Sequence, residues 1–114
     1  MQGFTEAEMA EALKDLPAWT LQSSTIPGKE PNERTELTRT YRFASFEQAI
    51  DFMYEAAKYI ARVDHHPRWE NSWRSVTVSL TTWDAGNVPT RLDVELARYL
   101  DSLYESYAPK PKPR

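Results

Sequence analysis

Apolar residues recur at helical spacing in three stretches of the chain, and the first stretch begins near residue 5. Thr5 and Glu8 have the spacing of a capping box, in which both side chains cap the first turn of a helix. The apolar residues that follow form one short stripe, made of Met9, Leu13 and Leu16. Because Pro17 cannot continue a helix, the sequence predicts a short helix that ends before it.

The longest amphipathic stretch begins at Ser45, which has capping-box spacing with Gln48. The apolar residues after it share one side of a helix, and we expect them to be core: Phe46, Ala49, Ile50, Met53, Ala56, Ala57 and Ile60. The helix cannot pass Pro67, so residues 63–69 are predicted to run extended into a sheet.

The last apolar stripe follows Thr90 and Asp93, whose spacing predicts the cap of a third helix. The stripe consists of Leu92, Leu96, Tyr99, Leu100, Leu103 and Tyr107. Residues 108–114 then alternate proline with basic residues and contain no apolar anchor. We therefore expect a single domain over residues 1–107 and a disordered, basic, proline-rich tail over 108–114.

Three other segments alternate apolar and polar residues with a period of two, the pattern of strands buried on one face. Residues 35–43 follow this pattern, except that Arg39 interrupts the apolar series. Residues 73–82 alternate valine and leucine with serine and threonine, so one face is apolar and the other is dense in hydroxyls. A short strand is predicted near residues 19–21, and the charged, turn-forming residues 26–34 predict a mobile hairpin loop.

This order of elements, without regular alternation of strands and helices, predicts an α+β fold with helices on one face of an antiparallel sheet. Such a sheet leaves edge strands that are commonly covered or paired with a second copy. We therefore expect a homo-oligomer.

Composition narrows the class of protein further. The chain has 114 residues, about the length of one domain, and its 14 basic and 17 acidic residues give a net charge of −3. This negative net charge argues against sequence-independent electrostatic binding of nucleic acid. The absence of cysteine excludes disulfides, a thiolate nucleophile and thiolate-bound metals. The sequence contains no apolar run of ~18 residues and no signal-peptide pattern, so we expect a cytoplasmic protein without membrane contact.

The two histidines are neighbours, in the run Asp64-His65-His66-Pro67. Histidine exchanges protons near neutral pH, so a pair beside a carboxylate suits general acid–base catalysis. Consecutive side chains of an extended segment point to opposite faces, so one imidazole can face a pocket while the other orients it. From spacing alone, two structural imidazoles at a helix end are the alternative. A metal site is disfavoured, because adjacent histidines do not easily converge on one ion.

Trp69, Trp73 and Trp83 follow the histidines closely. Flat ligands stack on such indoles, although each indole can equally fill the core or an oligomer interface. The sequence contains no glycine-rich phosphate loop and no serine nucleophile elbow. Nucleotide hydrolysis and acyl transfer therefore have no support.

The run from Asp64 to Pro67, followed at fixed spacing by Trp73, Trp83, Asp93 and Leu96, resembles the signature of the pterin-4a-carbinolamine dehydratases. The resemblance covers most of the chain. It implies three helices packed on one face of a four-stranded antiparallel sheet, in a homodimer or homotetramer. It also implies a reaction that removes water from a 4a-hydroxytetrahydropterin to give a quinonoid dihydropterin, with neither a metal nor an organic cofactor.

The resemblance assigns catalysis to His65 and His66, which act as proton donor and acceptor at the 4a-hydroxyl, with the more direct role given to His65. It further implies that the substrate is bound by Asp64, Pro67, Thr81, Thr82, Trp83 and Asp93. Together with Ser79, the two threonines are expected to hold the pyrimidine edge of the pterin.

Two positions depart from the usual pattern of that family. Trp83 stands where many members have a third histidine, which resembles a recurring variant, and Ala61 stands where many have an acidic residue. An acid–base group typically contributes ~10²–10⁴-fold in rate, so the loss of two such groups leaves both an enzyme and an inactive relative open.

Three hypotheses about function follow. The first is a dehydratase that recycles the oxidised product of a pterin-dependent hydroxylase. The second is a non-catalytic module that binds a protein, as members of the family do with a transcription factor and in Rubisco assembly. The third is a pterin-binding protein without turnover. Direct nucleic-acid binding is not expected in any of them.

Overall fold

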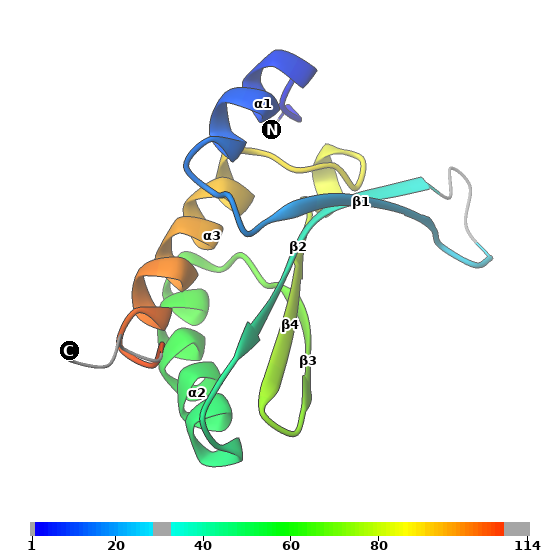
Figure 1. The fold of residues 1–114 in the computed structure, drawn as a ribbon. Helices are drawn as coiled ribbons and strands as arrows, with labels where there is room; N and C mark the ends of the chain where they lie inside the picture. Colours follow the sequence, from blue (N-terminus) through cyan, green and yellow to red (C-terminus); the bar gives the residue numbers. More distant parts are fainter. Residues whose placement is uncertain (1, 29–32, 109–114) are drawn as a thin grey trace.

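The computed structural model describes residues 2–28 and 33–108 and contains three α-helices, one 3₁₀ helix and four strands (Figure 1). In chain order these are α1 (Glu6–Leu13), β1 (Thr20–Thr25), β2 (Glu33–Arg42), α2 (Phe46–Val63), β3 (Arg68–Ser72), β4 (Ser75–Leu80), η1 (Trp83–Ala85) and α3 (Arg91–Tyr104). Residues 29–32 of the expected mobile loop and 109–114 of the expected tail lie outside the described residues. In the described part, no helix has the length and apolar character needed to cross a membrane.

The four strands form one antiparallel sheet in the order β1-β2-β4-β3. Figure 1 shows α2 and α3 side by side on one face of this sheet, which leaves the other face open. The α+β architecture is therefore confirmed, including the four-stranded sheet implied by the resemblance. The segment expected only to run extended into the sheet contains a paired strand, because Arg68–Ser72 pairs with β4.

The hydrophobic core lies between the sheet and its helices. The central strands contribute alternate residues that are fully or almost fully buried, namely Leu37, Tyr41, Val76, Val78 and Leu80. The ring of Trp19, which precedes β1, packs edge-on against Tyr41 from the same side. Burying a large apolar side chain stabilises a fold by about 1.5–3 kcal/mol, so this face of the sheet anchors the domain.

The predicted helix caps are confirmed at the ends of the chain and modified in the middle. Thr5 with Glu8, and Thr90 with Asp93, each form both halves of a capping box. Ser45 accepts a hydrogen bond from the Gln48 backbone N–H, but the Gln48 side chain accepts from Ala44 rather than from Ser45. All three helices therefore start where the sequence indicates.

The predicted core stripe of α2 is wrong at three of its seven residues, Phe46, Ile50 and Ala57, which are exposed. The buried residues of this helix are Ala49, Phe52, Ala56 and Ile60. Phe46 and Ile50, in contrast, are 45% and 41% exposed. The physical reason is that the sheet and α3 cover only one sector of the helix, so an apolar band wider than that sector extends into solvent.

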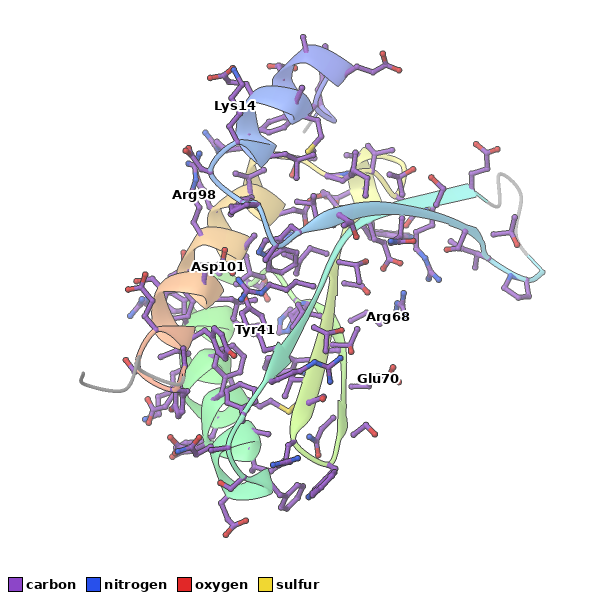
Figure 2. All side chains as sticks on the ribbon, viewed as in Figure 1. Lys14, Tyr41, Arg68, Glu70, Arg98 and Asp101 are labelled. Carbon is purple, nitrogen blue, oxygen red and sulfur yellow. The ribbon has the colours of Figure 1, made fainter. Side chains whose placement is uncertain are left out.

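Arg39, which interrupts the apolar pattern of β2, lies on the helix side of the sheet and is neutralised there. Its guanidinium bonds to Asp101 of α3 at 2.7 Å and stacks over the ring of Tyr41. The same Asp101 oxygen accepts hydrogen bonds from the Tyr41 hydroxyl and from the Trp19 indole, at 3.0 Å for the indole. Burial and the Asp101 carboxylate together raise the pKa of Tyr41, which keeps its hydroxyl a donor. Figure 2 shows Tyr41 and Asp101 facing each other between β2 and α3.

We expect Asp101→Ala to lower the free energy of unfolding by about 2 kcal/mol, because three partly buried donors lose their acceptor. Asp15→Ala is the matched control, since Asp15 pairs with Arg98 in full view of solvent and should change stability by less than about 0.5 kcal/mol. Denaturant unfolding of both variants measures the difference. Equal losses would contradict the role of Asp101 as an anchor.

Candidate functional site

The two histidines lie in the segment that connects α2 to β3. Helix α2 ends at Val63, and Asp64 adopts a left-handed conformation with φ of 53°, which aspartate tolerates better than most residues. The chain then runs toward Arg68, and the neighbouring imidazoles make different contacts. His65 Nε2 lies 2.6 Å from Asp93 Oδ1 under α3, whereas His66 Nε2 lies 3.1 Å from Asp64 Oδ1 at the surface.

Asp93 is a fully buried carboxylate, and it joins His65 to two threonines. Its second oxygen accepts hydrogen bonds from the Thr82 hydroxyl at 2.7 Å and from the Thr90 backbone N–H at 2.8 Å. The Thr82 and Thr90 hydroxyls are also 2.7 Å apart. Every buried side-chain polar atom in the described part of the chain has a partner, so this cluster is fully satisfied.

The hydrogen bond to Asp93 raises the pKa of His65, and the charges of Asp93 and Asp84 act in the same direction. Partial burial of the imidazole lowers the pKa, but by less than these interactions raise it. The protonated form of His65 is therefore favoured more than that of a free imidazole, while 13% of its side chain stays accessible. A fixed imidazole backed by a carboxylate is an arrangement that suits general acid–base catalysis.

A recess of about 220 Å³ opens on the face of the sheet opposite α2 and α3. Four of the residues expected to form the site line it, namely His66, Pro67, Thr81 and Trp83. The Trp83 side chain is 72% exposed and therefore offers an indole to a ligand in this recess. Ser79, expected beside the threonines, also lines it.

The remaining expected site residues lie around this recess rather than in its wall. His65, Thr82 and Asp93 form the buried cluster, and Asp64 stands in solvent beside His66. Direct contact of a ligand with Thr82 or Asp93 stays a prediction. Ala61, at the position where an acidic residue is usual, is exposed on α2.

Sequence reasoning missed four lining residues of the recess: Arg34, Glu36, Arg68 and Asn87. Glu36 is 3% exposed, and its carboxylate bonds to Arg68 at 2.6 Å and lies 3.3 Å from Arg34 Nε. Arg34 was placed in a loop, although it belongs to β2. The two-residue spacing of Arg34 and Glu36 could have predicted that they share a face, because residues two apart in a strand point to the same side of the sheet.

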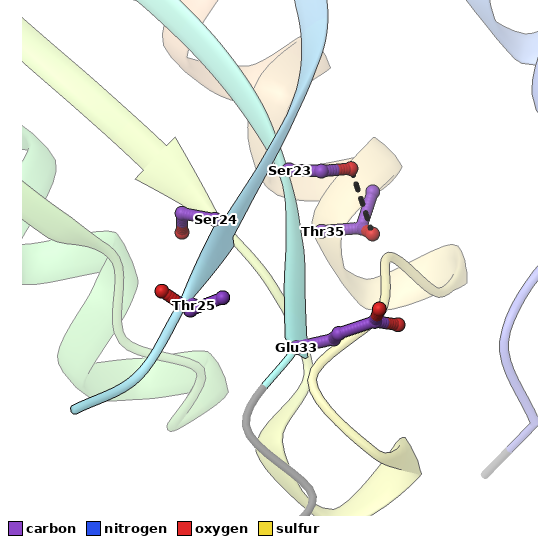
Figure 3. Close-up of a pocket in the computed structure, with 5 residues that line it drawn as sticks. All are labelled: Ser23, Ser24, Thr25, Glu33 and Thr35. Carbon is purple, nitrogen blue, oxygen red and sulfur yellow. Dashed lines mark hydrogen bonds between the residues drawn. The ribbon is translucent and has the colours of Figure 1, made fainter. Parts of the chain in front are cut away.

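A second hollow lies at the end of the β1–β2 hairpin where Thr25 pairs with Glu33, next to the segment that connects the two strands (Figure 3). Its described lining consists of Ser23, Ser24, Thr25, Glu33 and Thr35, among which the Ser23 and Thr35 hydroxyls are 3.4 Å apart. These groups include no imidazole and no paired acid and base, so the hollow is not taken as the candidate site. Residues 2–28 and 33–108 contain no group of three or more side chains suited to hold a metal ion.

The family model described as pterin 4 alpha carbinolamine dehydratase matches residues 2–103 of the chain. A protein of Opitutus terrae, provisionally named a pterin-4-alpha-carbinolamine dehydratase, is 39% identical over 99 residues, covering 87% of this chain and 91% of its own. A protein of Bradyrhizobium with the same provisional name is 42% identical over 94 residues, covering 82% and 84%.

Two solved structures share the fold. The crystal structure of a protein from Brucella melitensis, described as a transcriptional coactivator/pterin dehydratase, superposes with a TM-score of 0.72 at 36% identity and covers 90% of this chain and 98% of its own. A pterin dehydratase-like protein described as a RuBisCO assembly factor of the alpha-carboxysome has a TM-score of 0.57 at 21% identity and covers 75% and 88%. The second likeness concerns the fold alone.

The pairing of His65 with Asp93 should make stability depend on pH in a defined direction. Because the folded-state pKa of His65 is raised above its ordinary value of about 6.5, protonated His65 stabilises the fold below that pH. This contribution should be lost as the pH rises through the folded-state pKa. His65→Gln should remove that part of the pH dependence, as measured by denaturant unfolding at a series of pH values.

The matched control for this prediction is His66→Gln, since the carboxylate partner of His66 is exposed to water. This variant should keep the pH dependence of the wild type. Parallel stability curves for the wild type and His65→Gln would mean that the His65–Asp93 pair does not couple protonation to folding.

Proposed function

The chain belongs to the pterin 4 alpha carbinolamine dehydratase family, and we propose that it removes water from a 4a-hydroxytetrahydropterin. The observation that carries this proposal is a carboxylate-backed imidazole, His65, next to a recess lined by His66 and Trp83. A flat heterocycle can stack on the indole while an imidazole reaches its reacting edge.

The reaction needs only proton transfers, which these residues are suited to supply. The bond between C4a and its hydroxyl oxygen breaks, a proton is delivered to that oxygen to form water, and a proton leaves a ring nitrogen to give the quinonoid dihydropterin. No oxidant, reductant or metal enters this balance. We assign contact with the substrate, including proton acceptance, to His66, which lines the recess. We assign proton donation to the imidazolium of His65 through Nδ1, the ring nitrogen that is not bonded to Asp93, because 13% of this side chain stays accessible beside the recess.

Trp83 stands where many members of the family have a third histidine, so this position offers an apolar ring to the substrate and cannot transfer a proton. Its exposed ring at the mouth of the recess supports a role in stacking. The proton transfers must then be carried out by the two remaining imidazoles, those of His65 and His66. We infer that turnover survives, because Asp93 holds one of them in place and favours its protonated form.

A non-catalytic protein-binding module is the alternative, and the exposed apolar side of α2 suits either a foreign protein or a second copy of the chain. Phe46, Ile50 and Tyr54 succeed one another at intervals of four residues and are 45%, 41% and 63% exposed. On α3, Tyr99 and Leu103 pack against the core.

We propose that a second copy of the chain covers this side of α2. Glu47 and Asp51 flank the apolar row in the N-terminal half of the helix. On the same flank of the C-terminal half, Lys58 balances Glu55 in an i,i+3 pair and Arg62 adds a positive charge. Two copies packed antiparallel about an axis near Tyr54 would bring each acidic half beside a basic half. Such self-complementarity is what a two-fold interface requires.

Histidine variants test the catalytic proposal. His65→Ala should lower the rate of dehydration of a 4a-hydroxytetrahydropterin by roughly 10²-fold or more, and by more than His66→Ala does, because the proton donor is lost. Arg91→Gln on the exposed surface of α3 is the control and should keep the wild-type rate. Circular dichroism confirms that each variant is folded. If the folded wild-type protein shows no dehydration, the catalytic proposal is overturned and the non-catalytic protein-binding module is favoured.

Ile50→Glu tests the α2 interface. A buried charge in the middle of a two-fold contact is strongly unfavourable, so this variant should be monomeric at micromolar concentration where the wild type is a dimer or larger. Leu21→Glu, at an exposed position of the edge strand β1, should leave the assembly intact. Analytical ultracentrifugation decides, and a monomeric wild type would refute the interface.

A further inference from the structure

We propose that Arg34 and Arg68 bind an anionic substituent of the molecule that occupies the recess, so that the protein selects a pterin carrying a carboxylate or phosphate group. The inference rests on the proposed function, because it concerns the substrate class of the same recess. Its basis is a positively charged wall in a protein whose net charge is −3.

The two guanidinium groups come from β2 and β3, the strands on either side of β4, and lie on the same face of the sheet. Arg34 lies two residues before Glu36 on β2, while Arg68 begins β3 on the other side of β4. Arg68 pairs in register with Ser79, and its guanidinium crosses β4 to reach Glu36, with Nε at 3.3 Å and a terminal nitrogen at 2.6 Å. The small side chain of Ser79 leaves room for this crossing.

Glu36 positions both groups and is itself hidden by them. Its side chain is 4% exposed, whereas the side chain of Arg68 is 61% exposed and that of Arg34 is 24% exposed. One carboxylate faces two guanidiniums, so the cluster of three has a net charge of +1. A ligand approaching the recess meets the cations and not the carboxylate.

The exposed part of Arg68 is suited to anions. A guanidinium presents five N–H donors in a planar fork, and Arg68 uses Nε and one terminal nitrogen toward Glu36. The other terminal nitrogen can donate to a carboxylate or phosphate oxygen. Figure 2 shows Arg68 and Glu70 pointing away from the helices; Glu70 lies farther along β3 and does not line the recess.

His66, Trp83 and Arg68 line one recess. A pterin ring held at Trp83 with its reacting edge at His66 would therefore extend its side chain along the sheet face toward the arginines. An uncharged side chain would gain little there. An anionic side chain would form charge-assisted hydrogen bonds with donors that the fold has already positioned.

A purely structural role is the competing explanation, in which the Arg–Glu–Arg cluster only ties β3 to β2 across β4. An ion pair whose guanidinium is largely exposed to water contributes little to stability, so stability alone is a weak reason for this cluster. The two explanations differ in one measurable property, which is the preference for anionic over neutral ligands.

Binding is measured by the quenching of tryptophan fluorescence with three probes: pterin-6-carboxylate, neopterin monophosphate and neutral 6-hydroxymethylpterin. The wild type should bind at least one anionic probe roughly 10-fold more tightly than the neutral probe at low salt, and added salt should shrink the difference. Whichever anionic probe binds more tightly identifies carboxylate or phosphate as the preferred group. Trp83→Phe should remove most of the quenching while binding persists by calorimetry, which locates the probe.

Arg68→Gln and Arg34→Gln should each reduce the preference for the anionic probe to about 3-fold or less without changing the affinity for the neutral one. Arg91→Gln, an exposed arginine of α3, is the matched control and should keep the full preference. Equal affinity of the wild type for all three probes would overturn this inference and leave the proposed function standing. Saturable binding of none of them would overturn both.

Discussion

Asp93 is a buried carboxylate on which three separate parts of the molecule depend. It caps α3 through the Thr90 backbone, holds the end of the segment after β4 through Thr82, and fixes the imidazole of His65. A buried charge is costly unless it is paired and hydrogen-bonded, and here both oxygens are fully used. The position of the His65 imidazole is therefore coupled to the capping of a helix, so this cluster forms only when α3 is docked on the sheet.

Alternation of side chains along an extended chain explains how one short segment serves two purposes. His65 and Thr82 face the helices, whereas His66 and Thr81 line the recess on the open face of the sheet. Each of these pairs consists of neighbours in sequence. The fold thus places a buried acid and an exposed contact surface a single residue apart, and a shift of one residue in strand register would exchange them.

The sequence predicted the elements well because their signals are local. Capping boxes at Thr5 and Thr90 and the period-two pattern of β4 depend on residues a few positions apart. The outward-facing part of α2 was not predictable, because the width of its buried sector depends on what packs against it. The same limit applies to the site: the histidine run marked its location, but the contribution of Arg68 depends on the pairing of three strands.

The two imidazoles differ most in the carboxylate that each one faces. His65 faces Asp93, which is inaccessible to water. The pKa of His65 is therefore raised only while the folded structure holds the two side chains together. His66 faces Asp64, which is 89% exposed, and water screens an interaction of that kind. A substrate in the recess can therefore change the surroundings of His66 far more than those of His65. This difference suits a reaction in which one group keeps its proton until it delivers it to the departing hydroxyl, while the other adapts to the molecule that has bound.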